Sequence, residues 1–388
     1  MNVKKVLIFS LAYYPRYVGG AEVSVKEITD RLPEFEFDLV CLRFATPGPS
    51  VQQHGNVRVH YIGSDASARL PSWIGATRFR LQKFWFQFAA ARYGQKLHNE
   101  KKFDALWAVM AHSTGVPAAL FKKRNPGVLY ILNLQEGDPP EYIERVMRPL
   151  WPWFKSAFTS ADVVQPLSNF LAAWARRMGY AGPIEIVPNG VDGKKFVGEK
   201  IPHEPVVLVT SSRLVKKNAV DTIIRALPLL PNNVRLVIAG IGPEEASLKK
   251  LALDLQIEQR VLFKGFVSHD ELPELLHKSD IFIRPSRSEG QGASFIEAMA
   301  AGVPVIATQE GGIADFLFDA KRNPDKPTTG WAVDVDSPGQ IAGAVKDIVA
   351  NPEAALLVVE TARAIALKDY DWDLIAKHMQ GRVFSRVS

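Results

Sequence analysis

Two glutamates eight positions apart, Glu289 and Glu297, are the residues of this sequence best placed to do chemistry. Two glycines lie between them, where an apolar strand at 281–283 gives way to a helix of small residues at 297–301. The first backbone N–H groups of a helix have no internal partner, so a glycine turn before a helix predicts an anion site. Carboxylates instead accept hydrogen bonds from hydroxyl groups. The pattern favours a ligand with phosphates in its middle and hydroxyl groups at both ends, as in a nucleotide-sugar.

A basic pair follows an earlier predicted strand. Arg213 and Lys217 lie at the carboxyl end of that strand, where α/β proteins bind ligands, and Lys216 is a further candidate. Guanidinium and ammonium groups both suit phosphate, and each charge-assisted hydrogen bond contributes about 1.5–3 kcal/mol. We expect the pair to stabilise a departing diphosphate, whose negative charge grows as its bond to a sugar breaks. A solvated basic loop is the alternative for this segment taken alone.

Two strand ends in the first half of the chain carry further candidates. Gly19 and Gly20 follow the first predicted strand, and glycine lets a backbone approach a ligand closely. Their spacing does not fit a dinucleotide-binding loop, and the G-x-G phrase at 240–242 lacks a third glycine, so hydride transfer is disfavoured. His112 follows another strand, and taken alone it is more often a structural histidine than a site residue.

Short apolar runs alternate with stretches of helical period, which predicts parallel sheets covered by helices on both faces. The predicted strands are 6–10, 37–42, 57–61, 105–110, 128–132, 163–166, 206–210, 235–239, 261–264, 281–284 and 303–307. A Pro-Asn-Gly turn at 188–190 breaks the series. We therefore expect an α/β chain of two doubly wound, Rossmann-like domains, 1–187 and 188–369, followed by a terminal helix at 370–388.

The net charge of +6 is unevenly distributed along the chain. Residues 1–187 carry 23 Lys and Arg against 15 Asp and Glu, whereas residues 188–388 carry 24 against 26. The first half is therefore expected to face an anionic partner. The single cysteine, Cys41, lies in an apolar strand, which predicts a buried thiol in a reducing cytosol. No apolar run approaches the ~20 residues that span a bilayer, and no signal-peptide core is visible, so we expect a cytoplasmic protein.

Two segments without acidic residues combine aromatic and basic side chains, one at Arg78–Arg92 and the other at Arg145–Phe158. Aromatic residues beside Lys and Arg suit the headgroup region of an anionic membrane, so one hypothesis is a peripheral site on its inner face. The alternative is that the aromatic rings pack in the core and the charges only solvate the outside. Nucleic acid is a less favoured partner, because no recognised binding module appears.

The stretch Pro285–Glu297 resembles the second-domain signature of the retaining glycosyltransferases of family four, which have the GT-B fold. The phrase Ile186–Phe196 is similar to the interdomain phrase of that family, and the basic segment at 213–217 is similar to its phosphate-binding segment. The resemblance covers nearly the whole chain and is most specific in residues 205–315. It implies two Rossmann-like domains that face a cleft. One departure is visible, since Gln291 stands where members often carry an apolar residue.

The resemblance also implies a role for each candidate. Glu289 would bind hydroxyls of the donor sugar, Glu297 would bind the ribose, and His112 would position the sugar and stabilise the transition state. The implied donor-binding residues are Gly19, Gly20, Arg213, Lys217, Glu289, Gly290, Gln291, Gly292, Ala293 and Glu297. The implied catalytic residues are His112, Glu289, Arg213 and Lys217.

The acceptor side is less defined by the resemblance. Many relatives carry a histidine near Gln135, and its absence leaves Glu136 and Asp138 as candidates for binding acceptor hydroxyls or acting as a base. We expect transfer of a sugar from a nucleoside-diphosphate sugar, with retention, to a hydroxyl of a lipid-linked or polysaccharide acceptor. No Asp-x-Asp metal site is suitably placed, so we expect no metal cofactor. A nucleotide-sugar epimerase or phosphorylase of the same fold, and a non-catalytic nucleotide-binding scaffold, are the alternatives.

Overall fold

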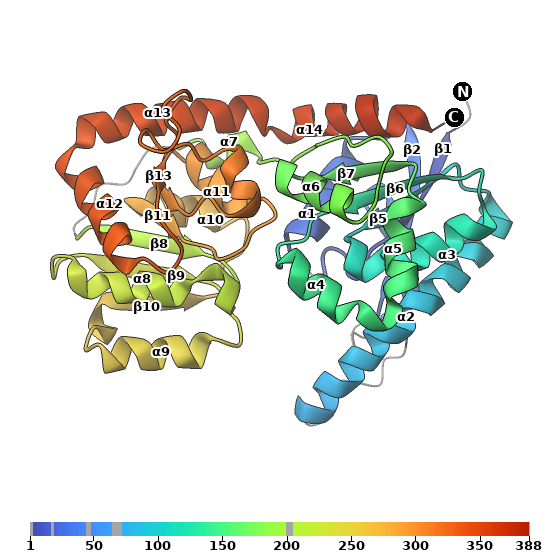
Figure 1. Ribbon diagram of the computed structural model, residues 1–388, viewed down its shortest axis with the longest axis horizontal. Helices are drawn as coiled ribbons and strands as arrows, with labels where there is room; N and C mark the ends of the chain where they lie inside the picture. Colours follow the sequence, from blue (N-terminus) through green and yellow to red (C-terminus); the bar gives the residue numbers. More distant parts are fainter. Residues whose placement is uncertain (1–2, 17–18, 44–47, 64–71, 199–204, 388) are drawn as a thin grey trace. The chain divides into compact units, whose positions relative to one another are not determined.

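The structure is a computed structural model that describes residues 3–16, 19–43, 48–63, 72–198 and 205–387, with only the backbone described for residues 72–80. The chain forms two compact units (Figure 1). Unit 1 comprises Met1–Asn189 and Trp372–Ser388, and unit 2 comprises Gly190–Asp371. Each unit is a sheet with helices on both faces, so the predicted doubly wound α/β class is confirmed.

The sheet of unit 1 has seven strands in the order β3-β4-β2-β1-β5-β6-β7. Among the described residues its neighbouring strands pair in parallel, apart from β3, which runs antiparallel to β4 at one edge. The strands are β1 Lys4–Phe9, β2 Phe35–Leu42, β3 Val51–His54, β4 Val57–Ile62, β5 Ala105–Val109, β6 Leu129–Leu134 and β7 Val163–Pro166. The sequence did not predict β3, because its residues are mostly polar and partly exposed.

Alternate side chains of β1 pack into two different hydrophobic cores, because successive side chains of a strand point to opposite faces of the sheet. Leu7 and Phe9 pack with α2, α3, α5 and α6, whereas Val6 and Ile8 pack with α1 and α14. All four side chains are fully buried, as expected for a parallel sheet covered on both sides. The helices of unit 1 are α1 Gly20–Asp30, α2 Ser72–Lys101, α3 Val116–Arg124, α4 Pro140–Val146, α5 Trp151–Thr159, α6 Asn169–Arg177 and α14 Trp372–His378.

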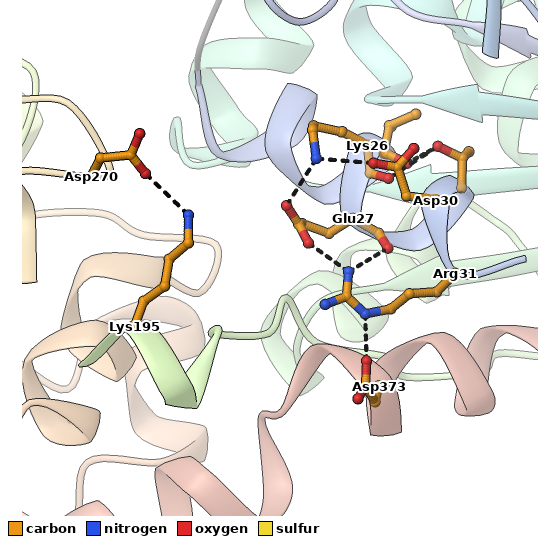
Figure 2. Close-up of polar contacts among 9 residues, drawn as sticks. Lys26, Glu27, Asp30, Arg31, Lys195, Asp270 and Asp373 are labelled. Carbon is orange, nitrogen blue, oxygen red and sulfur yellow. Dashed lines mark hydrogen bonds and ion pairs between the residues drawn. The ribbon is translucent and has the colours of Figure 1, made fainter. Parts of the chain in front are cut away.

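The end of the chain packs on unit 1. Trp372 of α14 is buried in the same core as β1, and the ring of Phe384 lies 5.3 Å from the ring of Phe35 in β2. At the surface, Arg31 at the end of α1 donates to Asp373 at 2.6 Å (Figure 2). Apolar packing and this ion pair hold the terminal segment to the first sheet.

The sheet of unit 2 has six strands in the order β10-β9-β8-β11-β12-β13, all parallel among the described residues. Helices α8, α9 and α12 cover one face, and α10, α11 and α13 cover the other (Figure 1). The strands are β8 Val207–Ser211, β9 Arg235–Ala239, β10 Val261–Gly265, β11 Ile281–Arg284, β12 Val305–Ala307 and β13 Trp331–Ala332. The helices are α7 Gly193–Phe196, α8 Val220–Ala226, α9 Glu245–Asp254, α10 Leu272–His277, α11 Ala293–Ala300, α12 Pro338–Ala350 and α13 Pro352–Asp369.

Candidate active site

Each sheet has one place where the order of its strands reverses direction. In unit 1 this switch lies between β1 and β5, and in unit 2 it lies between β8 and β11. Open α/β sheets bind ligands outside the carboxyl ends of their strands at such a switch. Arg213 and Lys217 follow β8, Glu289 follows β11, and His112 follows β5. The structure therefore places the residues predicted from the sequence at the two switch points, one group in each unit.

A glycine turn joins β11 to α11 and carries Glu289. Gly292, just before α11, has a φ of +83°, and a Cβ there would lie 2.5 Å from the ring of Phe295, so only glycine fits. The Glu289 side chain is buried at 6% exposure. Its Oε2 accepts from the Arg284 guanidinium at 2.5 Å, and its Oε1 accepts from the Gly290 amide at 3.1 Å. Both oxygens are held in one orientation and keep lone pairs for further donors.

A second pair of glycines holds the backbone of Glu289. The Gly312 amide donates to the Glu289 carbonyl at 3.0 Å. Gly311 has a φ of +63°, and a Cβ there would lie 2.1 Å from the same carbonyl oxygen. Any larger residue at Gly311 would displace Glu289. These glycines could not be singled out from the sequence, because no local pattern reveals a contact between positions 22 or 23 residues apart.

Glu297 lies in α11, four residues after the helix begins, and is also 6% exposed. Burial raises the pKa of this carboxyl group, and the nearby charges of His269 and Arg284 offset only part of the rise. The Nδ1 atom of His269 lies 3.5 Å from Oε1 of Glu297. A buried carboxylate is costly unless donors reach it, so this site favours a ligand that donates hydroxyl hydrogen bonds.

The basic loop after β8 contacts the glycine turn through its backbone. The Arg287 amide donates to the Lys217 carbonyl at 2.7 Å. On its other side the loop packs against Gly240, where φ is +151° and a Cβ would lie 1.8 Å from the Ser212 carbonyl oxygen. The Arg213 side chain is exposed, and the Lys217 side chain is half-buried. The loop that carries both predicted phosphate ligands is thus joined to the turn that carries Glu289.

The glycine pair of unit 1 begins α1. Gly19 precedes the helix with an extended backbone, and Gly20 is its first residue. A Cβ on Gly20 would meet nothing within 4 Å, and one on Gly19 would meet the flexible Glu22 side chain at 2.6 Å. Packing among the described residues therefore does not demand glycine here. The expected approach of a diphosphate to this backbone stays a prediction.

His112 lies in a π-helical turn, Ala111–Gly115, directly after β5. Its side chain is 30% exposed, and its Nδ1 lies 3.4 Å from Oε1 of Glu136. Its Nε2 lies 3.0 Å from the hydroxyl of Ser113. Imidazole next to a carboxylate and a hydroxyl can donate, accept or carry a proton. The arrangement suits the expected role in positioning a sugar, which stays a prediction.

Glu136 is buried beside His112, and its predicted role on the acceptor side stays a prediction. Its side chain is only 1% exposed, and it faces His112. Oε1 also lies 3.4 Å from the His112 amide, and Oε2 is buried without a hydrogen-bond partner among the described residues. Glu136 follows β6 by two residues, and its side chain turns toward the end of neighbouring β5. Asp138 is half-buried in the same loop, and its acceptor-side role stays a prediction.

The two aromatic and basic segments contain both buried and exposed rings. Phe86, Phe154 and Phe158 are fully buried in the core of unit 1, as the core alternative predicted. Four others form what we call the aromatic patch, with exposures of 39–51%: Phe84, Trp85, Phe88 and Trp153. The ring of Phe88 lies 5.7 Å from that of Phe84 and 6.2 Å from that of Trp153. The side chains of Arg78 and Arg80 are outside the described residues.

Within the described residues no helix combines the length and the apolar character that crossing a membrane requires. In the same part of the chain no three side chains of His, Cys, Asp or Glu gather as a metal site would need.

Comparison with known proteins identifies the family. The family model for glycosyltransferase family 4 matches residues 18–195, and the model for glycosyl transferases group 1 matches residues 192–365. The chain is 30% identical to an uncharacterized glycosyltransferase of Methanocaldococcus jannaschii, across 96% of each protein. The chain belongs to the family-four glycosyltransferases. The resemblance found at Pro285–Glu297 is thereby confirmed.

Part of this glycosyltransferase also matches curated mannosyltransferases. It is 33% identical over 237 residues to the GDP-mannose-dependent alpha-(1-6)-phosphatidylinositol monomannoside mannosyltransferase of Mycobacterium tuberculosis. The match covers 55% of this chain and 60% of the mycobacterial protein. The chain thus spans about 60% of the length of the curated relatives that it matches in this way.

Solved structures share its fold. Sucrose-phosphate synthase from Thermosynechococcus elongatus has a TM-score of 0.81 with 19% identity, over 99% of each chain. Anabaena Alr3699/HepE, in complex with UDP and glucose, has a TM-score of 0.75 with 17% identity, over 98% of this chain and 100% of that one. At these identities the likeness establishes the fold, which is the expected GT-B fold.

Proposed function

We propose that this glycosyltransferase moves a sugar from a nucleoside-diphosphate sugar to an acceptor hydroxyl, with retention of the anomeric configuration. The observation that carries the proposal is the pair of buried carboxylates on either side of the start of α11. Sugar hydroxyls would donate to Glu289 and ribose hydroxyls to Glu297. The diphosphate would lie between them, against the start of the helix and beside Arg213 and Lys217.

In the proposed reaction the acceptor oxygen replaces the diphosphate at the anomeric carbon of the sugar. Negative charge grows on the diphosphate as that bond breaks, and donors already in place stabilise it most effectively. Arg213, Lys217 and the first amides of α11 would supply these donors, with about 1.5–3 kcal/mol from each charge-assisted bond. We propose that these cations make a metal ion unnecessary.

The donor class is tested by a thermal-shift panel of UDP-, GDP- and ADP-sugars, because a ligand of the native state raises its melting temperature. GDP-mannose is the first candidate, since the mycobacterial relatives are named for it. Donor consumption is then measured with and without an acceptor. Acceptor-dependent turnover supports the transferase, acceptor-independent isomerisation supports an epimerase, and binding without turnover supports a scaffold.

The proposed metal independence is tested with the same donor assay. After extensive dialysis against EDTA, the enzyme should keep full activity, and added Mg²⁺ should change the rate by less than about twofold. Strict dependence on Mg²⁺ would contradict the proposal.

We also propose that the aromatic patch binds an anionic bilayer and brings the enzyme to a lipid-linked acceptor. Its four rings are exposed within the two segments that lack acidic residues, and Arg92 and Lys155 are exposed on the same helices, α2 and α5. The test is co-sedimentation with vesicles of phosphatidylglycerol and phosphatidylcholine at low salt. The Trp85→Ser/Phe88→Ser variant should lose binding, whereas the matched change Leu356→Ser/Leu357→Ser on α13, also exposed, should not. A wild type that stays in solution would remove this proposal.

A further inference from the structure

Arg284, the last residue of β11, is a buried arginine within the candidate site. Its exposure is 9%, although arginine is almost never buried unless it is paired. The sequence predicts an ordinary strand end at this position. Burying a guanidinium costs free energy unless several acceptors bind it. The acceptors that Arg284 contacts therefore indicate what the residue positions.

The guanidinium of Arg284 contacts the three segments that build the site of unit 2. Nη2 donates to Oε2 of Glu289 at 2.5 Å and to Oδ1 of Asn218 at 3.1 Å. Nη1 donates to the hydroxyl of Ser294, in the first turn of α11, at 2.8 Å. The carbon of the guanidinium lies 5.2 Å from the centre of the Phe295 ring. One cation thus joins the predicted sugar carboxylate to the start of the predicted phosphate helix.

Asn218 extends this connection to the basic loop. It is 2% exposed, and its amide group donates to the backbone carbonyl of Arg213 at 2.7 Å. A chain of hydrogen bonds therefore runs from Glu289 through Arg284 and Asn218 to Arg213. The groups expected at the sugar and at the diphosphate are linked through a single guanidinium.

We propose that Arg284 is a positioning residue, which fixes the direction of the Glu289 carboxylate and its spacing from the phosphate-binding loop. The inference rests on the proposed function. Because Oε2 faces Arg284 and Oε1 faces the Gly290 amide, the carboxylate cannot rotate freely, and its remaining lone pairs have defined directions. Arg284 contributes to transfer through Glu289 and does not itself touch the donor in this scheme.

The test compares Arg284→Met and Arg284→Lys with a matched control, Arg260→Met. Arg260 is also 9% exposed in unit 2, but it donates to the backbone carbonyls of Val234 and Pro231, at 3.0 and 2.8 Å. The control measures the general cost of removing a buried arginine. The readouts are kcat, KM for the donor, Kd for UDP and GDP, melting temperature, and rescue by methylguanidinium at a non-denaturing concentration.

We expect Arg284→Met to lower kcat about 10- to 100-fold, the range for loss of one charge-assisted hydrogen bond. The Kd for the free nucleoside diphosphate should change by less than about threefold. Methylguanidinium should restore part of kcat in Arg284→Met but not in Arg260→Met, and Arg284→Lys should keep part of it. In the Glu289→Gln background, Arg284→Met should cost less than about threefold more, because both changes remove the same interaction.

The outcomes are distinguishable. Activity of Arg284→Met within about twofold of the wild type overturns the inference alone, as does a loss that matches Arg260→Met and resists methylguanidinium. Full additivity with Glu289→Gln also overturns it, because Arg284 would then act independently. If Arg284→Met fails to fold, the kcat of Arg284→Lys and of the Arg284→Met/Glu289→Gln double variant are compared with wild type and Glu289→Gln, and the same criteria apply. A wild type that neither binds nor consumes any donor overturns the proposed function and this inference with it.

Discussion

Glu289 in unit 2 and Glu136 in unit 1 are both buried carboxylates that follow a strand, but they face different cations. Glu289 is paired with Arg284 at 2.5 Å and also accepts from a backbone amide. Glu136 lies 3.4 Å from the Nδ1 of His112, and its other oxygen has no partner among the described residues. One carboxylate is held on both sides, and the other is held on one.

The difference in cation corresponds to a difference in task. Arginine keeps its charge at every physiological pH and binds in a fixed geometry, so Arg284 suits a site whose carboxylate must stay in place. Histidine changes charge near neutral pH and can exchange its hydrogen-bonding roles. The pair in unit 1 is therefore suited to a step in which a proton or a hydrogen bond moves, and the pair in unit 2 to binding.

Removal of Glu289 should have the largest effect on activity. Glu289→Ala deletes the predicted contact with sugar hydroxyls and leaves Arg284 buried without its carboxylate, so kcat/KM should fall at least about 100-fold. The melting temperature should also fall, by about 5 °C or more. Steady-state kinetics with the best donor and differential scanning fluorimetry check the two results.

The matched control for that change is Glu274→Ala on α10. Glu274 is an exposed residue of the same unit, and it pairs with Lys278, four residues further along the chain. This control should keep both activity and melting temperature. If Glu289→Ala behaves like Glu274→Ala, the assignment of Glu289 to the donor sugar is wrong.

A smaller effect is expected from Glu136→Gln, which keeps the shape of the side chain but removes its charge. The pair with His112 is long, so we expect kcat to fall about tenfold, while Kd for the free nucleoside diphosphate stays unchanged. Glu141→Gln, an exposed residue of α4, is the control, and an equal effect of both variants would argue against any role for Glu136.

The strand ends of both sites were predictable from the sequence. Continuous apolar runs mark parallel strands, and the residues that follow such strands collect at one edge of the sheet. That rule was enough to place Glu289, Arg213 and His112 at the carboxyl ends of strands, whereas the strand order that makes those ends switch points came from the structure. The alternation of predicted strands with predicted helices likewise predicted the α/β fold class.

The partners of these residues were not predictable, because they depend on side-chain direction and on contacts between distant segments. Arg284 ends an apolar strand, and the path of residues 285–288 that returns Glu289 to its guanidinium is not visible in the sequence. Gly311 appears in the sequence as an ordinary turn residue until its distance from Glu289 is known. The direction of the Glu136 side chain, which turns toward His112, was likewise not visible in the sequence.

Glu297 is buried beside the exposed His269, so we expect its carboxylate to lower the stability of the fold while it serves binding. Burial raises its pKa, so the folded state holds a proton more tightly than the unfolded state does. Stability should therefore fall as pH rises from the unfolded value, about 4.3, through the raised value. Glu297→Gln removes this loss and should raise the melting temperature by about 2 °C at pH 7.5, with a gain that disappears near pH 4.

The same variant should weaken binding of the sugar nucleotide about tenfold, because an amide is a poorer acceptor for ribose hydroxyls. Glu353→Gln, an exposed change on α13, is the control for both measurements. A Glu297→Gln protein that is less stable than the wild type at pH 7.5 would show that the carboxylate is satisfied in the free enzyme. It would then be a structural group, as Glu289 is in its contact with Arg284.

Asp38 in β2 contacts both a lysine and a histidine, and its substitution should have the smallest effect on activity. It is 4% exposed and accepts from Lys101 at 2.5 Å, with the Nε2 of His60 at 2.7 Å. Burial raises the pKa of Asp38, but the hydrogen bonds from His60 and Lys101 outweigh it, so the pKa lies below its usual value. The ionised Asp38 carboxylate therefore stabilises the fold at pH values above its unfolded pKa of about 3.9. This stabilisation is lost as pH falls through the lowered pKa of the folded state.

Asp38→Asn should thus lower the melting temperature by about 4 °C at pH 7, with the gap to the wild type closing below about pH 4. Its kcat at 25 °C should equal that of the wild type, since Asp38 lies in neither candidate group. Lys101→Met leaves Asp38 with His60 alone, which imitates the pair of Glu136 and His112. If Lys101→Met lowers the melting temperature at pH 7 as much as Asp38→Asn does, the lysine supplies most of the stabilisation of this buried carboxylate, and a histidine alone holds such a group only weakly.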